Sequence, residues 1–400
     1  MTTTVSRDRD ALAALAKPLL LPPDSNSAKW GQSLAKGAPG IALLHVVRAA
    51  TGSGDWNTAH AWVAACLRRP VLSTPGTGLY FGAPVLAHLL RTAAAYGPRP
   101  YASQIAQLDN TVEKMAERRL AAAHQRITQL DRPIFAEYDL LYGMTGLGVH
   151  LRTCGDSHLL RDVLTYLVRL TEPLRDRPGW WTDIAPSGDA SPHYPGGHGN
   201  LGLAHGIPGP LALLALTYRD GIRVPGHRQA ITRITAWLDA WRQDAAAGSW
   251  WPEAVTANEV HVNRTRQQSP LRPSWCYGTP GIAHALHLAA LATEDEARAR
   301  SAEQALSDCL ADSAQLAELA DNSLCHGTTG LRLLTHRFAD RVPIPDTADR
   351  LRAAADGVPL LDIEPAEPGL LEGAAGTALA LQTLTTVRDG INWDACLLLI

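Results

Sequence analysis

A short glycine turn recurs along the whole chain and constrains its fold more than any other feature. Six copies read Gly-x-x-Gly before a small, apolar run, and they begin at Gly37, Gly143, Gly206, Gly278, Gly327 and Gly373. A seventh copy begins at Gly82 but has Val85 in place of the closing glycine. Successive first glycines are 45 to 72 residues apart, which leaves room for about two helices in each repeat.

The run after each turn predicts a buried helix. Segments such as 210–214 and 282–286 are apolar on every side, which is typical of a helix without a wet face. Segments 104–129 and 297–319 are amphipathic and predict outer helices with one face in water. The repeats therefore predict an all-α fold, an α/α toroid of about seven helical hairpins, in which closure lets every repeat bury both sides.

The regular spacing predicts a single domain over residues 1–400. Three segments rich in proline and glycine interrupt it near 175–202, 245–274 and 341–367, and we interpret them as loop insertions at the rim. Strand signals are sparse, since the chain has only three Phe and few alternating apolar runs.

Charge and hydropathy exclude several classes of function. The chain has 36 basic and 39 acidic residues, so it lacks the basic surplus of a protein built to bind nucleic acid. No apolar run approaches the roughly 18–20 residues of a transmembrane segment. The polar N-terminus lacks the pattern of a secretory signal, which predicts a cytoplasmic location and reduced cysteines.

Two of the turns carry cysteine at the same place. Cys276 lies just before the turn at Gly278, and Cys325 with His326 lies just before the turn at Gly327. Two thiolates and an imidazole are good zinc ligands, and three protein ligands leave a fourth position open, as catalytic zinc requires. The alternative is that both cysteines are buried packing residues. Their common register and the adjacent histidine favour zinc.

Three more residues near the turns are candidates for chemistry. His205 precedes Gly206, and we interpret it as standing where the other turns carry cysteine, as a fourth ligand or an acid/base. Asp139 lies four residues before Gly143, where it would orient His205; its alternative is a helix cap or a solvated carboxylate. Arg272 would stabilise negative charge in a transition state, or is a surface residue on a loop.

These motifs resemble one known family. Trp-Cys-Tyr-Gly at 275–278, Cys-His-Gly at 325–327 and Ala-His-Gly-Ile-Pro-Gly at 204–209 are similar to motifs of the lanthionine synthetase C family. The resemblance implies an α/α toroid with one central zinc ion per chain, held by Cys276, Cys325 and His326. It also implies that His205 and Asp139 are the acid/base pair.

The resemblance covers nearly the whole chain and extends to Arg272 and Tyr277, which match other active-site positions of the family. The length of the chain is similar to that of the free-standing cyclases rather than the fused dehydratase–cyclases. The chain departs from the pattern at Val85 and at Tyr142, which lies inside the Asp139 motif.

The function that the resemblance implies is the cyclisation of lanthipeptides, a class that includes the lantibiotics. Zinc activates cysteine thiols of a dehydrated precursor peptide with its leader, and the thiols add to dehydroalanine or dehydrobutyrine to form (methyl)lanthionine. A dehydratase and a transporter are implied partners, through which the chain would associate with a membrane.

Two alternatives stay open: a relative that binds glutathione or adds it to dehydrated residues, and a non-catalytic zinc-containing subunit that binds peptides. Two other enzyme classes fit less well. A zinc prenyltransferase needs an aromatic pocket, and a glycosidase needs paired carboxylates.

Overall fold

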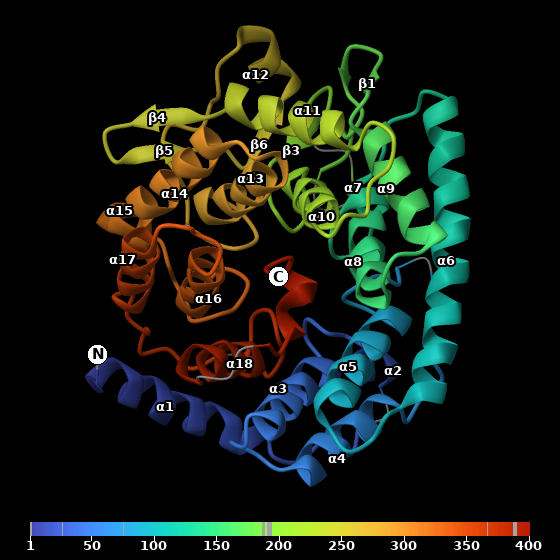
Figure 1. Cartoon of the computed structure of the whole chain (residues 1–400), viewed down its shortest axis with the longest axis vertical. Coiled ribbons are helices and arrows are strands. Elements are labelled where there is room, and N and C mark those ends of the chain that lie inside the picture. Colours follow the sequence, from blue (N-terminus) through green and yellow to red (C-terminus); the bar gives the residue numbers. More distant parts are fainter. Residues whose placement is uncertain are drawn as a thin grey trace. The chain divides into compact units, whose positions relative to one another are not determined.

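Helices carry nearly all the regular structure of the chain (Figure 1). The computed structural model describes residues 2–25, 27–74, 76–185, 189, 194–365, 367–386 and 390–400, with side chains from residue 5 onward. The strands within these residues are only two or three residues long. The predicted all-α class is therefore confirmed at the level of secondary structure. No described helix is both long enough and apolar enough to cross a membrane.

Contacts along the chain define two units, and the first comprises residues 1–113 and 319–400. Its α-helices are α1 (Thr2–Ala16), α2 (Ala28–Gly31), α3 (Ala38–Ala50), α4 (Trp56–Cys66), α5 (Ala83–Tyr96), α16 (Thr328–Ala339), α17 (Pro345–Asp356) and α18 (Ala374–Thr385), with short 3-10 helices at Lys17–Leu19 and Trp393–Leu397. The helices that follow glycine turns pack in the order α16, α18, α3, α5. The last repeat of the chain thus packs against the first, red against blue in Figure 1.

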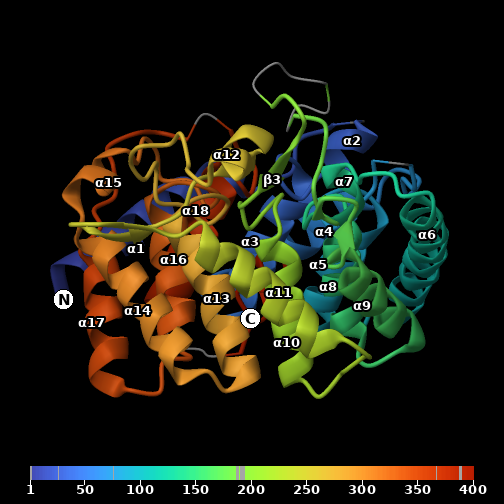
Figure 2. The same cartoon turned by 90° about the horizontal axis from the view of Figure 1, so that it is seen from above.

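The second unit comprises residues 114–318. Its helices are α7 (Phe135–Tyr138), α8 (Met144–Cys154), α9 (His158–Leu170), α10 (Pro208–Arg219), α11 (His227–Ala240), α12 (Ala257–Val262), α13 (Thr279–Thr293), α14 (Glu296–Ala311) and α15 (Ser313–Ala317); α6 (Ala102–Thr128) runs across the division at residue 113. Here α10 packs against both α8 and α13, while α9, α11 and α14 pack outside them (Figure 1). Figure 2 shows the same helices from above.

The second unit also contains short antiparallel pairs of β-strands. They join β1 (Pro173–Leu174) to β2 (Arg177–Pro178), β3 (His198–Asn200) to β6 (Ala254–Thr256), and β4 (Gln243–Ala245) to β5 (Gly248–Trp250). The predicted insertions at 175–202 and 245–274 contain β2, β3, β5, β6 and α12, whereas β1 and most of β4 precede them. Residues 186–188 and 190–193 lie outside the described part.

The predicted loop at 341–367 is wrong in its middle, where α17 spans Pro345–Asp356. Proline is typical of loops, but Pro345 occupies the first position of the helix, where a missing N–H costs nothing. Ala348, Leu351 and Ala355 then bury one face of the helix. The two predicted outer helices are confirmed by α6 and by α14 with α15. The single-domain organisation stays a prediction.

The seven glycine turns share one local structure. Three residues before each first glycine lies a buried side chain with at most 1% exposure: Leu34, Leu79, Leu140, Leu203, Trp275, Leu324 and Leu370. In the turns that begin at Gly37, Gly206, Gly278, Gly327 and Gly373, the second glycine packs on the carbonyl of this anchor. A Cβ at Gly330 would lie 2.0 Å from the Leu324 oxygen, and a Cβ at Gly376 would lie 1.6 Å from the Leu370 oxygen. Only glycine permits this approach at these positions.

Backbone hydrogen bonds join neighbouring turns. In the first unit they run from Leu34 N to Tyr80 O (3.0 Å), from Leu371 N to Ala35 O (3.1 Å) and from Cys325 N to Leu371 O (2.8 Å). In the second unit they run from Leu140 N to Ala204 O (3.1 Å) and from Ala204 N to Cys276 O (3.4 Å). Consecutive loops therefore lie side by side, and their register is fixed by the main chain.

Candidate functional site

The Cys276 loop is held by a serine two residues before the cysteine. Ser274 Oγ accepts a hydrogen bond from Tyr277 N (3.1 Å) and donates one to Tyr277 O (2.6 Å). The same oxygen lies 3.5 Å from Cys276 Sγ. Cys276 is buried, with 7% of its surface exposed. The sulfur is thus fixed by a short turn in front of helix α13.

The Cys325–His326 loop repeats this arrangement. Ser323 Oγ accepts a hydrogen bond from His326 N (3.3 Å), and Ser323 N donates to Asp321 Oδ1 (2.8 Å). Asp321 Oδ2 lies 3.3 Å from His326 Nε2. The hydrogen bond from His326 holds the pKa of Asp321 well below its usual range, so this carboxyl is ionised.

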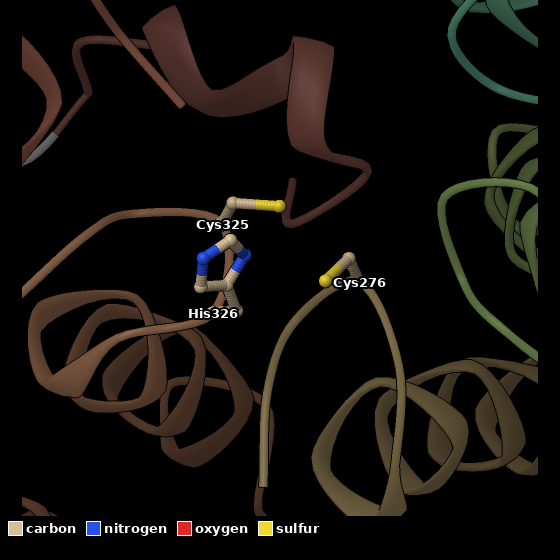
Figure 3. Close-up of side chains that lie close together, drawn as sticks. All are labelled: Cys276, Cys325 and His326. Carbon is tan, nitrogen blue, oxygen red and sulfur yellow. The ribbon is translucent and has the colours of Figure 1, made fainter. Parts of the chain in front are cut away.

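The ligand atoms of Cys276, Cys325 and His326 lie within 4.8 Å of one another (Figure 3). The structure therefore brings together the three residues that the sequence predicts as ligands. In Figure 3 one ring nitrogen of His326 is turned toward the two sulfurs and the other away from them. Two sulfurs and one imidazole nitrogen form a donor set that suits Zn²⁺ and leaves one tetrahedral position for another ligand.

His205 and Asp139 form a second arrangement, in the loops that neighbour the Cys276 loop within the second unit. His205 Nδ1 lies 2.7 Å from Asp139 Oδ2, as the sequence predicts. The Asp139 side chain is 1% exposed and that of His205 is 31% exposed. A carboxylate that accepts from Nδ1–H leaves Nε2 with its lone pair, so Nε2 is the nitrogen able to take a proton.

The other oxygen of Asp139 is occupied by its own loop. Oδ1 accepts hydrogen bonds from Tyr142 N and Gly143 N, both at 2.8 Å. The ring of Tyr142 is stacked on His205, with centroids 6.5 Å apart and an interplanar angle of 20°. Tyr142, a departure from the family pattern, therefore supports the pair: its backbone fixes Asp139 and its ring covers one face of His205.

The predicted register of His205 is wrong by one residue. The backbone hydrogen bond to Cys276 comes from Ala204, so Ala204 occupies the cysteine position of the repeat. His205 is equivalent instead to Tyr277 and His326, each directly before its first glycine. Counting back from the first glycine gives this register, because Cys276 and Cys325 stand two residues before it and His205 stands only one.

Tyr277 and Arg272 also lie in the second unit. Tyr277 Oη accepts a hydrogen bond from Asn200 Nδ2 at 2.9 Å, and burial raises the pKa of this phenol, which keeps its proton at neutral pH. Arg272 is half-buried, and its charge acts on Glu253. Burial raises the pKa of Glu253, the Cys276 thiolate raises it further, and Arg272 opposes both effects.

Sequence reasoning missed Asn200, Glu253 and Asp321. One signal was within reach: four residues before the first glycine, the side chains of Ser33, Asp139, Ser274 and Ser323 each accept from the backbone N–H three residues later. Asp139 is thus a loop cap whose second oxygen reaches His205. Asp321 could have been found by the same alignment, since it stands at the position of Arg272 relative to the glycine.

The glycine turns, the Cys276–Cys325–His326 group and the His205–Asp139 pair are the features by which a protein family can be assigned. The family model for lanthionine synthetase C-like proteins matches residues 28–398, and the chain belongs to this family.

One curated protein and one solved structure are similar to this chain. Nisin biosynthesis protein NisC of Lactococcus lactis subsp. lactis is 24% identical over 274 residues, which are 66% of this chain and 64% of that protein, so the match spans less than two thirds of the relative. A solved structure of nisin cyclase is similar with a TM-score of 0.80 and 20% identity, covering 100% of this chain and 98% of the other. This likeness confirms the predicted fold class, an α/α toroid.

Proposed function

We propose that this chain is a zinc-dependent lanthipeptide cyclase. Its substrate would be a dehydrated precursor peptide, whose cysteine thiols add to dehydroalanine or dehydrobutyrine to form lanthionine or methyllanthionine rings. The observation that carries the proposal is the convergence of two sulfurs and one imidazole within 4.8 Å. Membership of the family and the likeness to a nisin biosynthesis protein support it.

Cys276, Cys325 and His326 would hold one zinc ion per chain. The residues fit this ion because thiolate and imidazole are its preferred ligands and because each cysteine stands in a loop ordered by a serine. When bound, zinc supplies a Lewis acid beside which a thiol ionises near neutral pH.

His205 would carry the proton of the reaction. In this proposal its Nε2 accepts the proton that the substrate thiol releases, while Asp139 holds Nδ1–H and stabilises the imidazolium. The sulfur then forms a bond to the β-carbon of the alkene, and His205 returns the proton to the α-carbon. The carbon–carbon double bond is consumed, the hydrogen of the thiol ends on carbon, and no oxidant or reductant is needed.

Arg272 and Tyr277 would act on the negative charge that develops on the carbonyl oxygen beside the α-carbon. A guanidinium is always charged and stabilises an enolate by electrostatics. Tyr277 is a phenol that stays protonated, and a hydrogen-bond donor at this place would act in the same direction. Asn200 would orient the phenol oxygen.

The proposal is tested with a dehydrated precursor peptide that contains one cysteine and one dehydroalanine. Ring closure leaves the mass unchanged but removes the thiol, so thiol alkylation followed by mass spectrometry measures it. We expect the wild type to remove the thiol faster than the metal-stripped protein and faster than His205→Ala. His205→Ala closing rings at the wild-type rate would remove the role given to this histidine.

The same assay separates the alternatives. If the chain adds glutathione to dehydrated residues, the peptide gains the mass of glutathione when both are supplied. If the chain is a non-catalytic peptide-binding subunit, metal removal lowers its stability but no thiol is consumed at an enzymatic rate. We further propose that the chain acts in the cytoplasm. Its partners there would be a dehydratase and a transporter.

A further inference from the structure

The two nitrogens of the His326 ring have different surroundings. Nε2 lies 3.3 Å from Asp321 Oδ2, and it is the nitrogen that Figure 3 shows pointing away from the sulfurs. Nδ1 is therefore the nitrogen on the side of Cys325. The ring is held by its far edge, and its near edge faces the candidate metal position.

Asp321 is itself fixed by the loop. Its Oδ1 accepts from Ser323 N at 2.8 Å, and its carbonyl oxygen accepts from Thr328 N at 3.1 Å. Its side chain packs so closely on the turn that a Cβ on Gly327 would lie 2.3 Å from Oδ1. One carboxylate oxygen is thus tied to the backbone, which leaves Oδ2 aimed at His326.

The backbone of His326 is held from the same segment, because Ser323 Oγ accepts its N–H at 3.3 Å. Residues 321–323 therefore fix both the main chain and the ring of this histidine. A carboxylate on the far nitrogen of a metal-binding histidine sets the tautomer, orients the ring and makes the near nitrogen more basic.

We propose that Asp321 is a positioning residue for metal binding, which accepts Nε2–H of His326 and so presents Nδ1 as the zinc ligand. The inference rests on the proposed function, since it assumes that Cys276, Cys325 and His326 hold zinc. It adds a residue outside the three ligands; at the equivalent position of the Cys276 loop stands Arg272 rather than a carboxylate.

The first test compares the zinc affinity of Asp321→Asn with that of the wild type, by titrating metal-stripped protein with Zn²⁺ against a chromophoric chelator. In asparagine an N–H₂ replaces one carboxylate oxygen, so either Nε2–H of His326 or Ser323 N then faces a donor instead of an acceptor. We expect the dissociation constant to rise about 10- to 100-fold. Asp349→Asn is the matched control, since Asp349 is 76% exposed and should leave the affinity unchanged.

Thermal unfolding of the metal-free variants distinguishes positioning from folding. Asp321→Asn should unfold within a degree or two of the wild type without metal and differ from it only with zinc. If the metal-free variant is destabilised as much as the zinc-loaded one, the role is structural and the proposal is overturned.

A spectroscopic measurement keeps the proposal falsifiable if the variant folds poorly. Long-range ¹H–¹⁵N correlation spectra of histidine-labelled, zinc-loaded wild type report which nitrogen carries hydrogen, and His326→Gln assigns the signals. We expect Nε2–H with Nδ1 bound to metal. Coordination through Nε2, or an Asp321→Asn affinity within twofold of the wild type, would overturn the inference. A wild type that binds no zinc would instead refute the proposed function.

Discussion

At the scale of single residues, the proposed chemistry depends on Asp139. One of its oxygens is tied to the N–H groups of Tyr142 and Gly143, and the other meets His205 Nδ1 at 2.7 Å. A side chain fixed at both ends can hold one tautomer of a neighbouring histidine. In the proposed mechanism, the position that caps the turn in other repeats therefore determines which nitrogen of His205 handles the proton.

Asp139→Asn should leave the loop folded and slow ring closure. The amide oxygen can still accept from Tyr142 and Gly143, but the amide N–H₂ then faces His205 Nδ1 and favours the wrong tautomer. We expect a loss of about 10²- to 10⁴-fold in the rate of thiol consumption.

Asp131→Asn is the matched control for this change. Asp131 is exposed and precedes α7 in the same unit, so its substitution should leave the rate unchanged. An Asp139→Asn protein that is folded and closes rings at the rate of this control would contradict the orienting role.

At the scale of elements, the second glycine of each turn determines where the preceding loop lies. Gly330→Ala would place a Cβ 2.0 Å from the Leu324 oxygen, so the start of α16 or the loop of Cys325 must move. We expect destabilisation of about 2 kcal/mol or more, measured by urea unfolding.

Gly76→Ala is the comparison, because a Cβ there would meet nothing within 4 Å. Its effect should stay within about 0.5 kcal/mol. Equal effects of the two substitutions would show that the close approach at Gly330 does not constrain the turn.

Helix α1 is joined to helix α16 by a buried ion pair. Arg332 donates from Nη1 to Asp8 Oδ1 (3.1 Å) and from Nη2 to Asp8 Oδ2 (2.5 Å), and the side chains are 2% and 4% exposed. Asp8→Ala removes the hydrogen-bonded partner of a buried guanidinium, whose other carboxylate, that of Asp356, is 4.0 Å away. We expect it to cost about 3 kcal/mol in unfolding free energy.

The double variant Asp8→Ala/Arg332→Met should recover most of that loss, since it removes the buried charge as well. Asp10→Ala, at an exposed position on the same helix, should be nearly neutral. A single variant as stable as the Asp10→Ala control would mean that α1 is not held by this pair.

At the scale of the whole molecule, stability should fall in mild acid. His198 is fully buried between Phe135 and Tyr194, and its ring nitrogens have no hydrogen-bond partner among the described residues. Burial lowers its pKa to about 4. The unfolded chain binds this proton below about pH 6.5 and the folded chain only below about pH 4, so stability is lost as the pH falls through this window.

His198→Leu should reduce the fall in unfolding free energy between pH 7 and pH 5 by about 2 kcal/mol, measured from urea unfolding at each pH. His261→Gln, at an exposed position, is the control and should keep the wild-type dependence. An unchanged dependence in His198→Leu would mean that this ring does not titrate on unfolding.

The sequence predicted the features that repeat and missed those that depend on distant pairing. The seven turns, their buried helices and the nearness of Cys276 to Cys325 and His326 follow from local pattern and spacing. The hydrogen bond of Asn200 to Tyr277 comes from a contact between loops far apart in the chain. The register of His205 was within reach of the sequence, since His205 stands one residue before its first glycine and the cysteines stand two before theirs. Helix α17 is not predicted because a proline at a first helical position is also typical of a loop.

The most direct test of the account is the metal content of the purified chain, measured by elemental analysis beside three variants. The account predicts about one zinc ion per chain in the wild type and in Cys309→Ala, a buried cysteine on α14. It predicts nearly complete loss of zinc in Cys276→Ala and Cys325→Ala. A wild type without zinc, or a Cys276→Ala protein that keeps its full complement, would contradict the claim that these residues share one ion.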